Sequence, residues 1–212
     1  MGKQVKVALV VLTVALIGVI VWYVAHRPDK PIYQGRTLTN WLGDFGAVQV
    51  TFTPPRRGMA IASTREANEA VHQIGTNAIP TLLALLRVKD SALKVKLIYL
   101  LQRQHLLKFR LRPAEEWNAI AACAFSVVGT NAKPAVPELI AIANQNISKE
   151  SRCSAIGSLG GIGPAAAEAI PFLFQCMTNA DSQVRSAAYG TMLLIDPKAA
   201  AKAGVAITKT AP

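Results

Sequence analysis

The chain has 212 residues, of which 51% are hydrophobic and only 6% aromatic, and its formal net charge is +11. This composition argues against disorder and suits helices that pack through small residues. The charge favours an anionic partner or surface, although net charge concerns association and not fold. The cysteines Cys123, Cys153 and Cys176 form no CxxC pair and no zinc spacing with a histidine. We interpret them as small buried hydrophobic residues, with a Cys153–Cys176 bridge as the alternative if the domain is exported.

The N-terminal segment predicts a membrane anchor. Residues 7–25 form an uninterrupted apolar run of 19 residues, which as a helix reaches roughly 28 Å, about the hydrocarbon thickness of a bilayer. Trp22 and Tyr23 stand at its end, where amphipathic rings prefer the interface. A cleaved signal peptide is the alternative, but the run exceeds a usual signal core and Tyr23 would occupy a cleavage position that requires a small residue. We therefore expect residues 1–27 to form a cytoplasmic head and an uncleaved transmembrane helix.

The sidedness of the anchor depends on its flanks. Basic residues are balanced on its two sides, so the positive-inside rule gives little direction. A short head is the easier part to leave in the cytoplasm. We expect a single-pass inner-membrane protein whose larger part is extracytoplasmic.

Residues 28–62 are expected to hold a linker, a short capping helix and a loop. Gly35 predicts a turn, and Thr39 is the expected N-cap of the helix. We interpret the helix as a cover for the open end of a repeat array, through an apolar face formed by Trp41, Leu42 and Phe45.

Residues 63–205 carry a repeated pattern. A glycine closes an apolar helical run, and an Ala-aliphatic-Pro sequence then opens the next run. This follows the usual asymmetry of Gly at helix ends and Pro in the first turn. The last two copies follow each other at a period of about 34 residues, which indicates stacked helix pairs. The glycines are Gly75, Gly129 and Gly163, and the prolines that follow them are Pro80, Pro137 and Pro171.

The first unit of this array opens with a capping box at residues 63–66 and has Asn77 as the expected cap of its second helix. Its first helix has one apolar stripe. The first and second prolines are further apart than this period by roughly 23 residues, which matches an extra helix inserted near 91–112. The stripe is formed by Ala67, Ala70, Val71 and Ile74.

The last two units align with each other without gaps. Arg152 matches Arg185, and Ser148 and Asp181 occupy equivalent N-cap positions. A short final helix is expected near residue 198, and residues 206–212 are expected to form a frayed tail.

These residues resemble HEAT-type, armadillo-like helical repeats. The resemblance rests on Asp181-x-x-x-Arg185, on Ile195-Asp196-Pro197 and on the Ala-Ile-Pro helix starts. With the anchor and the stretch from Tyr33 to Leu42, the chain is similar to the small membrane-anchored HEAT-repeat proteins of Verrucomicrobia and related bacteria. The first unit departs from the pattern by a shorter turn, and the inserted helix breaks the period.

The resemblance covers residues 31–205. It implies an all-α protein in the form of an α-α superhelix, a short HEAT-like solenoid, behind a single N-terminal transmembrane helix. It also implies a non-catalytic scaffold for protein–protein interaction, without naming a partner. In such repeats Asp and Arg side chains link neighbouring units, a role it implies for Asp181, Arg152 and Arg185.

No catalytic, metal or cofactor motif is found in the sequence. The three histidines, His26, His72 and His105, stand alone, and none has a second ligand three or four residues away. Gly160-Gly161-x-Gly163 lacks the spacing and the preceding strand of a nucleotide fingerprint, so close helix packing explains it better. We therefore expect no enzyme activity and no cofactor.

Basic residues are concentrated between residues 87 and 112. We interpret them as the solvated outer face of the inserted helix, with a docking surface for anions as the alternative. Candidate polyanions are nucleic acid, anionic lipid and acidic polymer, of which nucleic acid is the less expected beside a membrane anchor. The residues are Arg87, Lys89, Lys94, Lys96, Arg103, Lys108, Arg110 and Arg112.

Two functions from different classes follow. The first is a membrane-tethered scaffold that binds a protein, and the second is a binder of polyanions through the basic segment. Solenoid surfaces serve binding far more often than catalysis, which favours the first. A reproducible protein partner or salt-sensitive polyanion binding would discriminate between them.

Overall fold

The computed structural model describes residues 31–45, 65–91 and 112–202, and every structural statement below refers to these residues. They belong to one compact unit, Pro31–Pro212. Most of them are helical, in agreement with the expected all-α class. The expected anchor at 7–25, the start of the capping box, the inserted helix and the tail at 206–212 lie outside the described residues.

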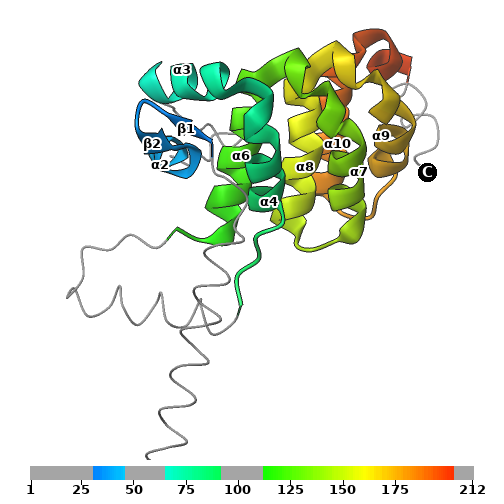
Figure 1. Ribbon diagram of the computed structural model, residues 1–212. Helices are drawn as coiled ribbons and strands as arrows, with labels where there is room; N and C mark the ends of the chain where they lie inside the picture. The colour runs from blue at the N-terminus through cyan, green and yellow to red at the C-terminus, as the bar shows by residue number, and fades with distance from the viewer. Residues whose placement is uncertain (1–30, 46–64, 92–111, 203–212) are drawn as a thin grey trace, which may run out of the picture. The chain divides into compact units, whose positions relative to one another are not determined.

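A β-hairpin precedes the first helix (Figure 1). Strands β1 (Ile32–Tyr33) and β2 (Arg36–Thr37) pair antiparallel, with Ile32 opposite Thr37. The two residues between them, Gln34 and Gly35, have φ values of 48° and 74°, the pattern of a type I′ turn. The turn at Gly35 is confirmed, whereas the sequence did not predict the strands because each has only two residues.

Helix α2 (Leu38–Gly43) begins two residues earlier than expected. Thr37 occupies the N-cap position, and Thr39 lies inside the helix with its Oγ1 3.2 Å from Thr37 Oγ1. The expected apolar face is confirmed, since Trp41, Leu42 and Phe45 are buried. Trp41 Nε1 also donates to the Tyr33 carbonyl at 3.0 Å, which ties α2 to the hairpin.

The first helix pair consists of α3 (Arg65–Ile74), the 3-10 helix η1 (Gly75–Ala78) and α4 (Ile79–Leu86). The predicted stripe on α3 is buried. Asn77 lies inside η1 and caps nothing at the start of α4, because the chain passes from the 3-10 turn directly into the α-helix. The expectation of an Asn77 cap was therefore wrong.

Two further pairs follow the same plan. The first is α6 (Ala114–Val128), η2 (Gly129–Ala135) and α7 (Val136–Gln145). The second is α8 (Lys149–Ile162), η3 (Gly163–Ala169) and α9 (Ile170–Met177). Helix α10 (Ser182–Ile195) comes next, and residues 197–202 are again helical.

The glycine and proline of each pair take the expected positions. Gly75, Gly129 and Gly163 have φ values of 57°, 61° and 73°. L-residues with a side chain rarely adopt this left-handed half of the map, so glycine is required where the helix ends. Each following proline is the second residue of its helix, where a missing N–H leaves no helical bond unmade.

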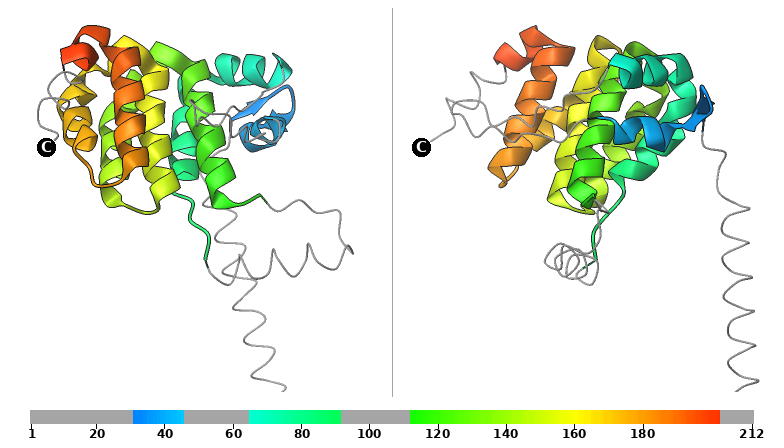
Figure 2. Two further views of the ribbon diagram at one scale, coloured as in Figure 1. Left: turned by 180° about the vertical axis from the view of Figure 1, so that it is seen from behind. Right: turned by 90° about the vertical axis from the view of Figure 1, so that its left-hand side faces the viewer.

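The helices form two layers, with α6, α8 and α10 in one and α4, α7 and α9 in the other (Figures 1 and 2). Small residues bring the helices of the first layer close together. A Cβ added to Gly161 would lie 2.9 Å from the Ser126 backbone on α6. One added to Gly160 would lie 3.3 Å from Thr191 Oγ1 on α10. The interpretation of the Gly160-Gly161 pair as a device for close packing is confirmed.

Hydrogen-bonding side chains cap the helices of the last units. The Ser148 hydroxyl accepts from the Ser151 N–H, and the Asp181 carboxylate accepts from the Gln183 N–H, as predicted. At the start of α6, the Asp90 carboxylate accepts from the Ala114 N–H at 2.7 Å. Asp90 thus connects the end of the first pair to the start of the second.

Two described segments, Ala114–Gln145 and Lys149–Met177, are long and apolar enough to cross a membrane by length and composition alone. Each consists of two helices joined by a 3-10 turn, and 44% and 50% of their most apolar windows are buried in the fold. Helices of a protein core pass the same test. Core packing accounts for their apolarity.

Candidate binding groove

An open groove of about 440 Å³ runs across the layer of α6, α8 and α10. All three helices line it, and it lies beside the contacts of Gly160 and Gly161 described above. Because the first turns of the three helices line the same groove, the helices run in the same direction. The lining residues are Glu115, Ala119, Ala122, Cys123, Lys149, Glu150, Cys153, Ser154, Gly157, Gln183 and Ala187.

The polar rim of the groove is formed by the helix N-termini. Glu115 and Glu150 are exposed second residues of α6 and α8, where a carboxylate interacts favourably with the helix dipole. Lys149 pairs with Asp181 at 3.2 Å. No cation among the described residues pairs with Glu115 or Glu150. The rim therefore presents carboxylates next to an apolar floor.

The floor of the groove is made of small side chains. Gly157 is an interior helical glycine, and a Cβ placed on it would meet no atom within 4 Å. A glycine inside a helix destabilises the helix by about 0.5–1 kcal/mol relative to alanine. Packing within the described residues does not account for this glycine, and close approach of an external chain would.

The cysteines differ from their expected burial. Cys176 is buried, but Cys123 and Cys153 are half-buried and both line the groove. None of the three is in a disulfide, so the alternative Cys153–Cys176 bridge is not formed. Burial, and then the nearby Asp181 carboxylate, raise the pKa of the Cys153 thiol. A protonated thiol is a poor nucleophile, so Cys153 has a packing role in this arrangement.

Asp181 links neighbouring repeats, as the resemblance implied. Its carboxylate caps α10 and pairs with Lys149 at the start of α8. The hydrogen bond from the Gln183 N–H lowers the pKa of the Asp181 carboxylate, and the hydrogen bond from the Lys149 side chain lowers it further. Arg185 instead donates to the carbonyls of Asn179 and Ala180 in the loop before its own helix.

Arg152 has its contact within its own helix pair. Burial raises the pKa of the Cys176 thiol, and the Arg152 guanidinium beside this thiol opposes the rise to a smaller extent. Arg152 and Arg185 therefore make their contacts within their own helix pairs. Of the three residues that the resemblance singled out, Asp181 is the one that connects two neighbouring units.

Buried polar side chains that the sequence did not single out also join the units. Asn118 of α6 donates to the carbonyls of Leu85, Leu86 and Val88 at the end of α4. Ser151 of α8 donates to the Leu86 carbonyl at 2.6 Å. On α10, Thr191 donates to the Ile156 carbonyl of α8 at 3.0 Å. A single Asn, Ser or Thr in a helix has no sequence signal that distinguishes such a bond from a solvated side chain.

Three of the predicted basic residues are described. Arg87 pairs with Glu138 of α7, Lys89 is exposed, and Arg112 is mostly buried. Arg112 donates to the Gly43 carbonyl at 2.5 Å and pairs with Glu116 at 3.2 Å. The interpretation of Arg112 as part of a solvated face or of an anion-docking surface was wrong, because its charge is used inside the fold.

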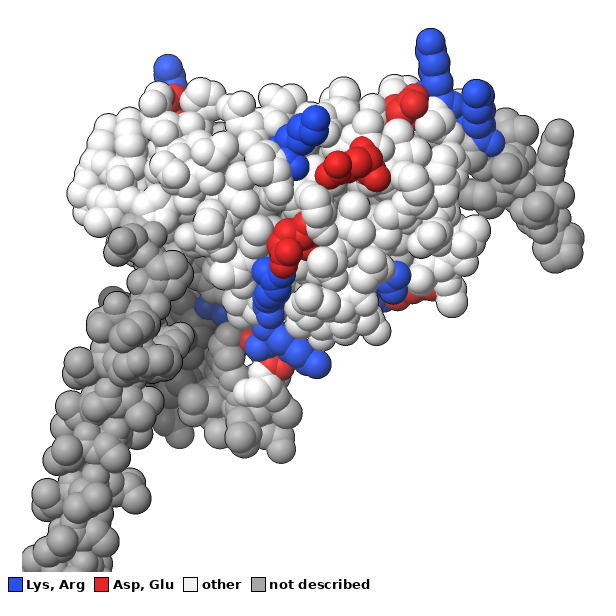
Figure 3. Space-filling view, turned by 45° about the vertical axis from the view of Figure 1, so that its right-hand side comes forward, with Lys and Arg blue, Asp and Glu red and all other residues white. Residues whose placement is uncertain are grey.

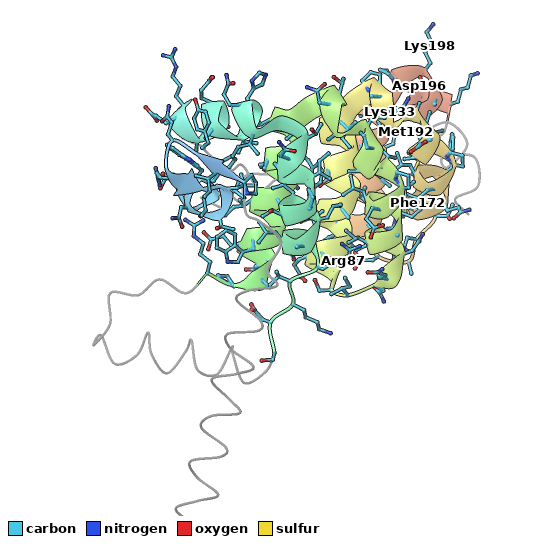
Figure 4. All side chains as sticks on the ribbon, in the orientation of Figure 1. Arg87, Lys133, Phe172, Met192, Asp196 and Lys198 are labelled. Atoms are coloured by element: carbon cyan, nitrogen blue, oxygen red, sulfur yellow. The ribbon has the colours of Figure 1, made fainter. Side chains whose placement is uncertain are left out.

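Figure 4 places Arg87 at the lower edge of the helical layers, whereas Asp196 and Lys198 lie at the upper edge near the C-terminal helices. The five remaining residues of the predicted basic set lie outside the described residues. They are Lys94, Lys96, Arg103, Lys108 and Arg110.

The described residues are neutral as a set. They contain 11 Lys and Arg and 11 Asp and Glu, and Figure 3 shows these charges scattered over one face among uncharged residues. The four segments outside them contain the other 12 basic residues and a single Asp. The whole net charge of +11 therefore belongs to residues 1–30, 46–64, 92–111 and 203–212.

Within residues 31–45, 65–91 and 112–202, no group of three His, Cys, Asp or Glu side chains could hold a metal ion. Comparison of the chain with protein-family models, with curated proteins and with solved structures finds no match. The geometry of the groove and the sequence pattern therefore carry the functional argument.

Proposed function

We propose that this chain is a membrane-tethered scaffold, a short HEAT-type solenoid whose groove on α6, α8 and α10 binds a segment of a partner protein. The observation that carries the proposal is the groove itself. Its floor consists of small side chains, and Gly157 opens it further at a cost to helix stability. Such a floor lets another chain come close to the helix backbones.

The repeat plan supports the solenoid. Three helix pairs use the same sequence of positive-φ glycine, 3-10 turn and proline in the first helical turn. Such stacked repeats produce extended surfaces that serve binding. The tether is proposed from residues 7–25, with the repeat domain outside the cytoplasm.

Site-specific photo-crosslinking in intact cells tests the groove. A photoreactive residue replaces Gln183 in the groove or, as the control, the exposed Gln73 of α3. We expect a discrete adduct from position 183 and none from position 73. Gly157→Leu, whose Cβ would meet no atom within 4 Å and whose side chain would occupy the groove, should abolish the adduct. Equal labelling at both positions, or an adduct that survives Gly157→Leu, would contradict the proposal.

Sidedness needs a separate experiment. Alkaline phosphatase and a fluorescent reporter are fused separately after Pro212. We expect phosphatase activity without fluorescence, as for an extracytoplasmic domain. Fluorescence without phosphatase activity would place the repeats in the cytoplasm.

The charge distribution supports polyanion binding as a second candidate function. Residues 92–111 hold five Lys and Arg and no acidic residue, whereas the described residues are neutral. Binding of the full chain to vesicles with anionic lipid should fall steeply with added salt. Replacement of Lys94, Lys96 and Arg103 by Gln should weaken it, whereas Lys133→Gln and Lys198→Gln should not. Binding that is insensitive to salt would exclude this function.

A further inference from the structure

The helices of the first layer contact one another through equivalent positions. Ser126 of α6, Gly160 of α8 and Leu193 of α10 are equivalent, each one repeat further along the chain. Ser126 lies against Gly161 of the next helix, and Gly160 lies against Thr191 of the next helix. This position therefore faces the following helix of the layer. After α10 the described residues contain only the helical turn at 197–202, which aligns with η3 and is not a further helix of this layer.

The corresponding face of α10 is apolar and exposed. Ile156 of α8 is fully buried, whereas its equivalent on α10, Tyr189, is 39% exposed. Leu193, one turn further, is 42% exposed. Tyr189 and Leu193 are four residues apart and so lie on one side of the helix. Two large apolar side chains thus occupy the positions that elsewhere in this layer contact a neighbour.

The same helix has almost no charge. Arg185 is the one charged residue among its 14, and its guanidinium donates to two carbonyls of the preceding loop at 2.7 and 2.8 Å. A solvated helix face normally carries charged residues, as α3 does with Arg65, Glu66 and Glu69. A helix without charges meets no electrostatic repulsion when it lies against its own copy.

Gly190 adds a hollow to this face. A Cβ on Gly190 would meet no atom within 4 Å, so no contact among the described residues explains a glycine inside the helix. It lies three residues before Leu193. A leucine side chain from another helix fits against such a gap, in the way that Leu194 packs against Gly160 within the chain.

The opposite end of the described unit is closed. The hairpin and α2 lie beside α3, and Leu38 and Leu42 of α2 are fully buried. A second copy therefore meets no equivalent open helix face there. Association of two α10 helices uses the same face twice and closes as a two-fold dimer.

We propose that two copies of this chain associate through α10, with Leu193 of each copy packed against Gly190 of the other and Tyr189 beside this contact. Tyr189 and Leu193 lie away from Gln183 and Ala187, which line the groove, whereas Gly190 is three residues after Ala187 and lies between the two faces. The proposed dimer therefore borders the groove, but neither the contacts that support it nor its test involve binding of a partner protein there.

The test measures the mass of the full chain in detergent by light scattering over a range of protein concentrations. We expect a dimer that dissociates on dilution. Leu193→Glu should raise the dissociation constant by about tenfold or more, because it buries a charge at the centre of the interface. Ile32→Glu, at an even more exposed apolar residue of the hairpin, should change it less than twofold.

Two further variants separate this interface from misfolding and from contacts made elsewhere. Gly190→Ala should raise the thermal stability of the monomer and weaken the dimer, which a folding defect could not do. Leu193→Cys should form an intermolecular disulfide on mild oxidation, whereas Gln73→Cys should not. A wild-type monomer at all concentrations would overturn the proposal. So would a dimer that persists in Leu193→Glu or fails to cross-link through position 193.

Discussion

Neighbouring helices in the layer of α6, α8 and α10 meet through glycine, serine and threonine, whereas the two layers meet through leucine, isoleucine and phenylalanine buried from both sides. The first layer also contains the buried polar residues Asn118, Ser151 and Thr191, whose hydrogen bonds cross between units. Contacts within the first layer thus depend on short backbone distances, and contacts between the layers depend on apolar volume. A substitution that enlarges a side chain should harm the contacts within the first layer, and one that removes buried volume should harm the core between the layers.

The largest expected effect lies in the second layer. Leu139→Ala in α7 removes a fully buried side chain, and we expect it to lower the free energy of unfolding by about 3–4 kcal/mol through lost burial and a cavity. Urea unfolding followed by circular dichroism measures this change. Leu83→Ala on α4, at a partly buried position, serves as the control and should cost clearly less. Equal losses would mean that volume in this layer is not the deciding quantity.

Enlargement should be nearly as harmful in the first layer. The methyl group of Gly161→Ala would lie 2.9 Å from two backbone atoms of Ser126, so α6 and α8 must separate at a cost of about 2–3 kcal/mol. Gly157→Ala on the same helix meets no atom within 4 Å and should instead stabilise the fold by about 0.5–1 kcal/mol. The same unfolding experiment compares the two. A stabilising Gly161→Ala would remove the distinction between the layers.

A buried hydrogen-bonding group should have a smaller but definite effect. Asn118→Ala removes the side-chain donor that ties α6 to the carbonyls of Leu85, Leu86 and Val88, and we expect a loss of about 2 kcal/mol. Ser126→Ala provides a comparison, because its hydroxyl bonds only within its own helix. Both are measured by thermal unfolding, and a loss at Ser126 as large as that at Asn118 would argue against the inter-unit bonds.

The smallest effect concerns pH. Because the pKa of Asp181 is lowered in the folded chain, the charged carboxylate stabilises the fold above the pKa of the unfolded state, which is about 3.9. That contribution disappears as the pH falls through the lower folded pKa. The stability difference between wild type and Asp181→Asn should therefore be present at neutral pH and vanish in strong acid. A difference that persists unchanged at low pH would show that the charge is not its origin.

The sequence predicts the features of this fold that depend on local chemistry. The three glycine-to-proline junctions, the caps Ser148 and Asp181, and the apolar stripe of α3 all follow from backbone rules that act over a few residues. The N-caps expected at Asn77 and Thr39 were wrong. The 3-10 turn η1 leads directly into α4, and the hairpin sets the start of α2 at Leu38.

The groove and the polar ties depend on contacts between units, and the sequence offers little access to them. Asn118 and Ser151 both reach the Leu86 carbonyl, although each belongs to a later unit of the chain. Arg112 shows the same limit. Its position in a run of basic residues predicted a surface charge, yet it bonds the Gly43 carbonyl and the Glu116 carboxylate. Long-range partners decided its role, and the local pattern could not reveal them.

The hydrogen bond between the Asp90 carboxylate and the Ala114 N–H has a consequence for how this chain tolerates change in length. It brings together two residues that are 24 positions apart in sequence, at the junction of two helix pairs. When two positions of a chain are held at one point, residues can be gained or lost between them without displacing the helices on either side. Doubling the length of a flexible connection closed in this way costs only about 0.6 kcal/mol. The junction is thus a natural insertion point, where new binding residues could be added while the repeats on both sides keep their packing.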